Sequence, residues 1–249
     1  MARLDGKVAL ITGAGAGIGR AAARIFSAEG ASVVIAELKP ELGQASERAA
    51  REAGGEVAFV ETDVTDEASV EHAVAETVRR FGNPTVLYNC AGGSLPEDAA
   101  VSEVDLAVWD HTISLDVKGT FLCCRHAVPR MAEAGGGSII NMSSVAALRG
   151  NFPGHVYSAA KGAILSLTRA LAGRYARDGI RANAICPGIV LTERVQARLG
   201  EEAPGVARRH PFGVGQPEDI AHIALFLASD ESRMINGAAI PAEGGLSAY

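Results

Sequence analysis

A tyrosine and a lysine able to do acid–base chemistry lie close together in Tyr157-Ser-Ala-Ala-Lys161. If this segment is helical, residues four apart share a face, and the ammonium group lies near the phenol. A neighbouring positive charge favours the phenolate, lowering a phenol pKa that starts near ~10. Such a phenol can take a proton from an alcohol or give one to a carbonyl. Alone, the pair also fits an ordinary turn of amphipathic helix, so the chemical interpretation depends on the rest of the chain.

Short apolar segments alternate with segments of helical period along the whole sequence. Strands are expected at residues 7–12, 31–36, 57–60, 85–88, 138–142, 181–185 and 239–240. Helices are expected at residues 20–26, 40–53, 67–81, 104–131, 157–177 and 218–227, with a break near Gly119 left open. This alternation predicts an α/β Rossmann fold, a doubly wound parallel sheet with helices on both faces. Without repeats or linkers, residues 1–249 are expected to form a single domain, in which residues 189–217 are a substrate lid.

The composition excludes several classes of protein. Of 249 residues, 48% are hydrophobic, which is enough for a sizeable core. The net charge of −6 gives no basic footprint for nucleic acid or an anionic membrane. No apolar run approaches the roughly 20 residues of a membrane span, and the N-terminus does not resemble a signal peptide. The four scattered cysteines indicate reduced thiols and no metal site, so a cytoplasmic protein is expected.

A glycine-rich loop at residues 13–19 joins the first strand to the first helix. Glycines there let the backbone approach a pyrophosphate, whose charge is favoured at a helix N-terminus. Glu37, at the end of the second strand, can accept hydrogen bonds from ribose hydroxyls and would repel a 2′-phosphate. Ala16 is not basic and Lys39 is the only nearby cation, so NAD is favoured over NADP. For the glycine-rich loop the alternative is a tight turn without a ligand, and for Glu37 it is a surface glutamate at a strand end.

Taken together, the polar and glycine motifs resemble those of the short-chain dehydrogenase/reductase family over essentially the whole chain. They are Thr12-Gly13-x-x-x-Gly17-Ile18-Gly19, Asn89-x-Ala91-Gly92, Ser144, Tyr157-x-x-x-Lys161 and Pro187-Gly188-x-x-x-Thr192, in the family's order and spacing. The resemblance implies an enzyme that transfers hydride with a nicotinamide dinucleotide. It also implies a homotetramer, with helices containing residues 109–131 and 157–177 in one interface and the C-terminal strand in another.

The resemblance assigns catalytic roles to three residues. Tyr157 would be the general base in oxidation and the general acid in reduction, and Lys161 would lower its pKa and hold the nicotinamide ribose. Ser144, thirteen residues before Tyr157, would orient and polarise the substrate oxygen. Ser143 is interpreted as a strand-end residue.

Cofactor contacts are implied in the same way. The residues are Gly13, Gly17, Ile18 and Gly19 at the pyrophosphate, Glu37 at the adenosine ribose, Asp63 and Val64 beside the adenine, Asn89, Ala91 and Gly92 along the cleft, and Pro187, Gly188, Val190 and Thr192 towards the nicotinamide. For Asp63, a role as a helix-start or turn residue stays open.

The sequence departs from the family pattern at two positions. Cys90 replaces the second Asn of an Asn-Asn-Ala-Gly motif, which we expect to be tolerated. Asp116 stands where the family usually has an Asn that completes a proton relay with the lysine, largely through its backbone carbonyl and a water. An Asp keeps the carbonyl, and an ionised side chain would strengthen the ammonium form of Lys161. We expect activity to persist; a near-isosteric exchange without consequence is the alternative.

Two segments are expected to line the substrate site. The first contributes Val145, Ala146, Leu148, Asn151, Phe152 and His155, a mainly apolar set that suits a neutral ketone or secondary alcohol. The lid contributes Arg194, Arg198, Arg208, Arg209 and His210, which either lie on a solvated face or attract an anionic substrate.

The sequence therefore predicts an NAD-dependent oxidoreductase that interconverts a small secondary alcohol and a ketone. One alternative is an NADPH-dependent 3-oxoacyl-carrier reductase, against which Glu37 and Ala16 argue. Another is a non-catalytic dinucleotide-binding regulatory protein, against which Ser144, Tyr157 and Lys161 argue.

Overall fold

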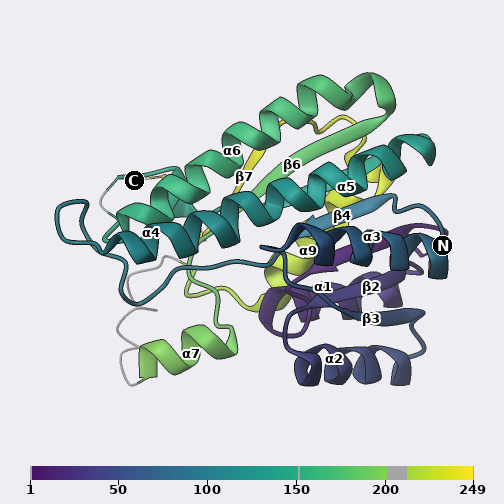
Figure 1. Ribbon diagram of the computed structural model, residues 1–249, viewed down its shortest axis with the longest axis horizontal. Helices are drawn as coiled ribbons and strands as arrows, with labels where there is room; N and C mark the ends of the chain where they lie inside the picture. The colour runs from purple at the N-terminus through teal and green to yellow at the C-terminus, as the bar shows by residue number, and fades with distance from the viewer. Residues whose placement is uncertain (1, 151, 201–211, 249) are drawn as a thin grey trace.

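The strands of the computed structural model, which describes residues 2–150, 152–200 and 212–248, form one parallel sheet of seven (Figure 1). They are β1 (Val8–Thr12), β2 (Ser32–Glu37), β3 (Val57–Glu61), β4 (Val86–Asn89), β5 (Gly137–Met142), β6 (Ile180–Pro187) and β7 (Ala239–Ala242). Their order in the sheet is β3-β2-β1-β4-β5-β6-β7. The order in which the chain adds strands reverses between β1 and β4, which lie parallel, and open parallel sheets bind ligands at the carboxyl ends of the strands beside such a switch point.

Helices cover both faces of this sheet. On one face α1 (Gly17–Ala28) packs against α2 (Pro40–Glu52) and α9 (Pro217–Ala228). The other face carries α3 (Glu67–Phe81), α5 (Gly119–Glu133) and α6 (His155–Tyr175). Because both faces are covered, β1 is buried at every residue, which explains its unbroken apolar sequence. The predicted doubly wound α/β fold is confirmed.

The helix expected over residues 104–131 runs through Gly119 without a break. It consists of α4 (Leu106–Thr112), a π-helical segment (Ile113–Lys118) and α5. Gly119 keeps helical backbone angles, and a Cβ there would lie 2.9 Å from Val64 Cγ2. The π-helical segment turns Asp116 inward, where only 1% of its surface is exposed. Such segments frequently occur at functional sites.

The lid also differs from expectation, because it contains a helix, α7 (Glu193–Leu199), that weak periodicity did not predict. Thr192 begins this helix, its Oγ1 accepting from the backbone N–H of Val195 at 3.3 Å. Four residues expected at the substrate site, Asn151, Arg208, Arg209 and His210, lie outside the described residues. None of the described helices is long and apolar enough to cross a membrane.

Candidate active site

Helix α6 brings Tyr157 and Lys161 together at the carboxyl ends of the strands. The Lys161 Nζ atom lies 5.4 Å from the centre of the Tyr157 ring, as a spacing of four residues on a helix requires. Lys161 is buried, whereas Tyr157 is half-buried, with its ring tilted against Phe152 at a centroid distance of 5.8 Å. The site thus joins a fixed cation to a phenol that a ligand can reach.

Asp116 contacts Lys161 through its side chain. Its Oδ1 atom lies 3.2 Å from Lys161 Nζ, which also donates to the carbonyl of Met142 at 3.0 Å. The same Oδ1 accepts from the backbone N–H of Gly93 at 3.0 Å. The backbone carbonyl of Asp116 accepts from Thr120 Oγ1 at 2.8 Å. The carboxylate, which was expected to strengthen the ammonium form of Lys161, thus pairs with it directly, and the relay through the carbonyl stays a prediction.

The electrostatics of the site keep Lys161 charged. Burial disfavours the ammonium form, but the Asp116 carboxylate and Tyr157 outweigh it and raise the pKa of Lys161 above its ordinary value. Burial raises the pKa of the Cys90 thiol to about 11, so this cysteine is a neutral thiol at neutral pH. The charge available to a neighbouring phenol is thus the ammonium of Lys161.

Ser143 and Ser144 use their hydroxyl groups differently. Ser143 donates to the backbone carbonyl of Lys161 at 2.8 Å, which ties the end of β5 to α6. Ser144 Oγ accepts from the N–H of Ala146 at 3.1 Å, beginning a short 3-10 turn, Val145–Ala147. Its hydrogen stays available to donate, so the geometry suits the role expected of Ser144.

Asp98 is a positioning residue that sequence reasoning missed. Its carboxylate accepts from the N–H of Tyr157 at 2.8 Å and from that of Val156 at 3.2 Å. Both N–H groups belong to the first turn of α6, where no helical carbonyl can accept them, and Gly154 at the N-cap has no side chain. His155 is joined to the same loop, its Nδ1 accepting from the N–H of Val101 at 3.0 Å. No local pattern reveals a cap supplied from so far along the chain.

We expect Asp98→Ala to lower both stability and turnover. A lost cap costs about 0.5–2 kcal/mol of unfolding free energy. Because the capped residue carries the reacting phenol, a shift of its helix end should also lower kcat, and a misplacement of about 1 Å can cost roughly a hundredfold. The matched control is Asp66→Ala, which removes the carboxylate that caps α3 by accepting from the N–H of Ala68. Urea unfolding and initial rates are measured on both; equal kcat in the two variants would reduce Asp98 to a structural cap.

The glycine loop has the features that a pyrophosphate site needs. The N-cap residue of α1 is Ala16, whose side chain makes no hydrogen bond to the first turn of the helix. That turn also holds no acidic residue. Gly17 begins the helix with φ of 50°, a left-handed value that favours glycine. Thr12 Oγ1 accepts from the N–H groups of Cys90 and Ala91, both at 3.1 Å, and so joins this loop to the one after β4. A nicotinamide dinucleotide fits these residues.

Glu37 lies beside the glycine loop, as predicted from its place at the end of β2. Its Oε2 accepts from the N–H of Gly15 at 3.1 Å, and its Oε1 from that of Lys39 at 3.0 Å. These bonds hold a carboxylate where a dinucleotide's adenosine ribose is expected.

Of the two residues expected beside the adenine, Asp63 also has a local role. Its Oδ1 accepts from both the N–H and the hydroxyl of Thr65, each at 2.8 Å, so it forms a turn before α3. Val64 is buried and packs with the apolar residues of α3 and α5.

Asn89 lies in a buried polar cluster beneath the cleft. Its Nδ2 donates to Asn141 Oδ1 at 2.8 Å, while its Oδ1 has no partner among the described residues. Asp116 Oδ2 is likewise buried without a hydrogen-bond partner among the described residues. Buried polar atoms seldom lack partners, and two such acceptors at this edge of the sheet fit a site completed by a bound group.

The segment that follows β6 reaches the start of α1 at Thr192. Gly188 donates to the carbonyl of Ala242 at 3.1 Å, and Val190 is buried and bridges Gly215. Pro187 ends β6, and the side chain of Thr192 lies against Gly17, where a Cβ would be 2.8 Å from its Cγ2. Of the residues predicted to bind the nicotinamide end, Thr192 thus borders the glycine loop.

Glu193 places its carboxylate at the N-terminus of α1. Its Oε2 accepts from the N–H of Gly17 at 3.1 Å, and its Oε1 pairs with Arg20. Backbone hydrogen bonding at Glu193 itself, then the charge of Arg20 and the Gly17 N–H, hold its pKa below the ordinary value. A carboxylate is favoured there for the same reason as a pyrophosphate, so the two compete.

We expect Glu193→Gln to bind the dinucleotide more tightly, by about two- to fivefold, since helix-end charges are worth roughly 0.3–1 kcal/mol. NADH fluorescence titration measures the Kd. Glu218→Gln, which removes the partner of Arg24 on the same helix, is the control. Because the Glu193 pKa is lowered, the carboxylate is charged throughout neutral pH, and the difference between wild type and variant should be constant from about pH 6 to 8. A looser complex would show that Glu193 helps to hold the cofactor.

Three of the other residues predicted to line the substrate site can be placed in the structure. Val145 is buried, Phe152 contacts the Tyr157 ring, and Leu148 is exposed. Across the ranges that the structure describes, no group of side chains could hold a metal ion.

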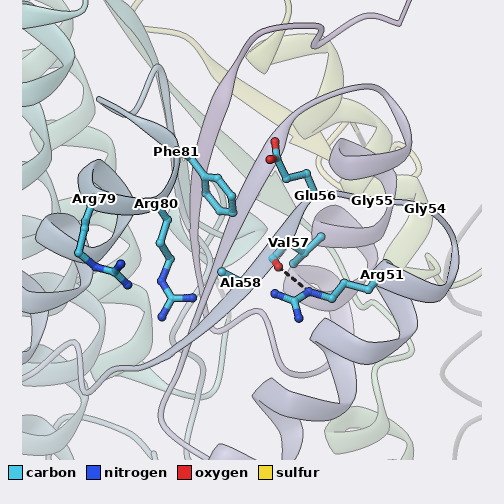
Figure 2. Close-up of a pocket in the computed structure, with 9 residues that line it drawn as sticks. All are labelled: Arg51, Gly54, Gly55, Glu56, Val57, Ala58, Arg79, Arg80 and Phe81. Atoms are coloured by element: carbon cyan, nitrogen blue, oxygen red, sulfur yellow. Dashed lines mark hydrogen bonds between the residues drawn. The ribbon is translucent and has the colours of Figure 1, made fainter.

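A hollow at the opposite, amino-terminal ends of the strands is a poor candidate for the reaction (Figure 2). It is lined by Arg51, Gly54, Gly55, Glu56, Val57, Ala58, Arg79, Arg80 and Phe81. Figure 2 shows Arg51 directed at the carbonyl of Val57, with the Nε–O distance 2.9 Å. The arginines pair with Glu47 and Glu76, so their charges are already compensated.

Comparisons with known proteins agree with this geometry. A family model described as enoyl-(acyl carrier protein) reductase matches residues 13–247. A probable short-chain type dehydrogenase/reductase of Bradyrhizobium diazoefficiens is 41% identical over 100% of this chain and 90% of its own length. The cis-4-hydroxycyclohexanecarboxylate dehydrogenase of Sinomonas cyclohexanicum is 39% identical over 97% of both chains.

Solved structures give the same answer. The crystal structure of a short-chain dehydrogenase/reductase from Burkholderia xenovorans superposes with a TM-score of 0.95 and 36% identity, over 100% of this chain and 99% of that one. With sheet order, glycine loop and the Tyr157–Lys161 pair in place, this chain belongs to the short-chain dehydrogenase/reductase family of oxidoreductases.

Proposed function

We propose that this protein is an NAD-dependent oxidoreductase that interconverts a secondary alcohol and its ketone, with Tyr157 as the acid–base group. The observation that carries the proposal is the buried, charged Lys161 held 5.4 Å from the Tyr157 ring at the carboxyl edge of the sheet. The Sinomonas relative supports the substrate class, since its named substrate is a secondary alcohol.

Each residue of the site has a definite task in this reaction. The bound dinucleotide supplies or accepts the hydride. Tyr157 takes the hydroxyl proton in oxidation and returns it in reduction, and the Lys161 ammonium stabilises the phenolate between these events. Ser144 donates its hydroxyl hydrogen to the substrate oxygen as charge develops there. Asp98 and Asp116 hold the tyrosine and the lysine in place.

Glu37 supports NAD as the cofactor, because its carboxylate would accept from the ribose hydroxyls and repel a 2′-phosphate. A homotetramer is part of the proposal, and light scattering measures it directly. Its support is three exposed apolar side chains on α4 and α5, Leu106, Trp109 and Phe121.

The decisive experiment compares initial rates with NAD and NADP over secondary alcohols, ketones and 3-oxoacyl thioesters, with Tyr157→Phe as the blank. Turnover with NAD that disappears in the blank supports the proposal. A strong NADP preference together with reduction of carrier-bound 3-oxoacyl chains would favour the carrier reductase instead. Tight cofactor binding without turnover on any member would favour a regulatory protein.

A further inference from the structure

Two arginines of the lid lie against the loop that follows β4. Arg194 Nη1 donates to the carbonyl of Gly92 at 3.4 Å, and Arg198 Nη1 to the hydroxyl of Ser94 at 3.1 Å. The approach is close: a Cβ at Gly93, where φ is 141°, would overlap the guanidinium of Arg194. Helix α7 therefore directs two positive charges at one short stretch of backbone.

The described partners of these arginines are neutral. Among the described residues no carboxylate lies within ion-pair distance of Arg194 or Arg198, whereas Arg20 on α1 pairs with Glu193. A guanidinium has five N–H donors, and within the described ranges Arg194 uses one of them, in a bond at 3.4 Å. Both groups can take up an anion without breaking an ion pair to any residue that the structure describes.

Arg194 also lies within reach of the reacting groups. A Cβ at Gly92 would be 3.4 Å from Lys161 Nζ, and one at the next residue, Gly93, would touch Arg194. Adjacent residues are about 3.8 Å apart along the backbone, so the ammonium and the guanidinium lie within roughly 12 Å of each other. A ring or a short carbon chain can span that interval.

We propose that the substrate of this protein is an anionic alcohol or ketone whose carboxylate is bound by Arg194, with Arg198 adding to the local positive charge. This inference rests on the proposed function, since it places the substrate oxygen at Tyr157 and Ser144. The planar fork of a guanidinium matches the two oxygens of a carboxylate, and such pairs are stronger than neutral hydrogen bonds. Arg194 is thus a specificity-determining residue.

The test uses a matched pair of probes, 4-oxocyclohexanecarboxylate and its methyl ester, reduced with NADH. The wild type should prefer the acid. In Arg194→Met the ratio of kcat/KM for acid to ester should fall by about ten- to a hundredfold, as expected for a lost charged hydrogen bond of roughly 1.5–3 kcal/mol. Arg194→Lys, which keeps the charge without the fork, should give an intermediate ratio. Arg125→Met, which removes an arginine of α5 that pairs with Glu67 of α3, is the control for net charge.

A binding experiment separates failure of this inference from failure of the proposed function. Calorimetry compares cyclohexanecarboxylate with cyclohexanecarboxamide on the enzyme saturated with NADH. Tighter carboxylate binding that Arg194→Met removes supports the inference even if neither ketone turns over. Equal binding of acid and amide, an unchanged acid-to-ester ratio, or a weakened NADH complex in Arg194→Met would overturn it, the last by assigning the arginine to the cofactor.

Discussion

Replacing Tyr157 with Phe is expected to lower kcat at least about a hundredfold, because general acid–base catalysis by one side chain contributes roughly 10²–10⁴. The change removes one oxygen atom and leaves the ring. The packing of that ring against Phe152 and the position of Lys161 near its face should persist. Folding and cofactor affinity should therefore change little, so the loss appears in kcat rather than in the Kd for NADH.

The measurement combines initial rates in both directions with NADH fluorescence titration and circular dichroism. Tyr175→Phe is the matched control, since this tyrosine ends the same helix but lies beside Arg174, away from the cleft. A Tyr157→Phe variant that kept more than about a tenth of the wild-type rate would remove this residue from the acid–base role. A variant that lost NADH affinity to the same extent would indicate a binding role instead.

The parts of the fold that local chemistry determines were predictable from the sequence. Helix α3 has the expected bounds, 67–81, because Asp66 caps it locally and Gly82 ends it. The strands were found because a doubly covered parallel sheet needs unbroken apolar segments. The order of the strands in the sheet was not predicted and comes from the structure.

Two of the features that escaped prediction depend on contacts between distant segments. Asp98 caps α6 from another loop, and Glu193 reaches the start of α1 from the lid. The π-helical turn around Asp116 has no sequence signal of its own, and it contains the buried carboxylate that pairs with Lys161. Motifs therefore identified the groups that we propose to react, whereas the residues that hold them required the three-dimensional structure.

Asp116→Ala is expected to destabilise the protein by about 3–5 kcal/mol, the usual result of leaving a buried charge without its partner. Lys161 would keep only the carbonyl of Met142, and Gly93 would lose its acceptor. Asp116→Asn keeps an acceptor oxygen for both and should lose less. Urea unfolding measures the difference, with Asp110→Ala on the exposed side of α4 as control.

The same pair of variants tests how Asp116 affects activity, through the pH profile of Asp116→Asn. In the wild type the raised pKa of Lys161 keeps its ammonium charged from neutral pH to about 10.4, and the stability that its ion pair contributes is lost as the pH rises through the folded pKa. Without the carboxylate, burial is no longer offset and the Lys161 pKa falls. The variant should therefore lose kcat at a lower alkaline pH than the wild type, while its rate near neutrality stays measurable. Coincident alkaline limbs in the two profiles would mean that the carboxylate does not set the charge of Lys161, and that Asp116 acts only by holding Gly93 and the lysine in position.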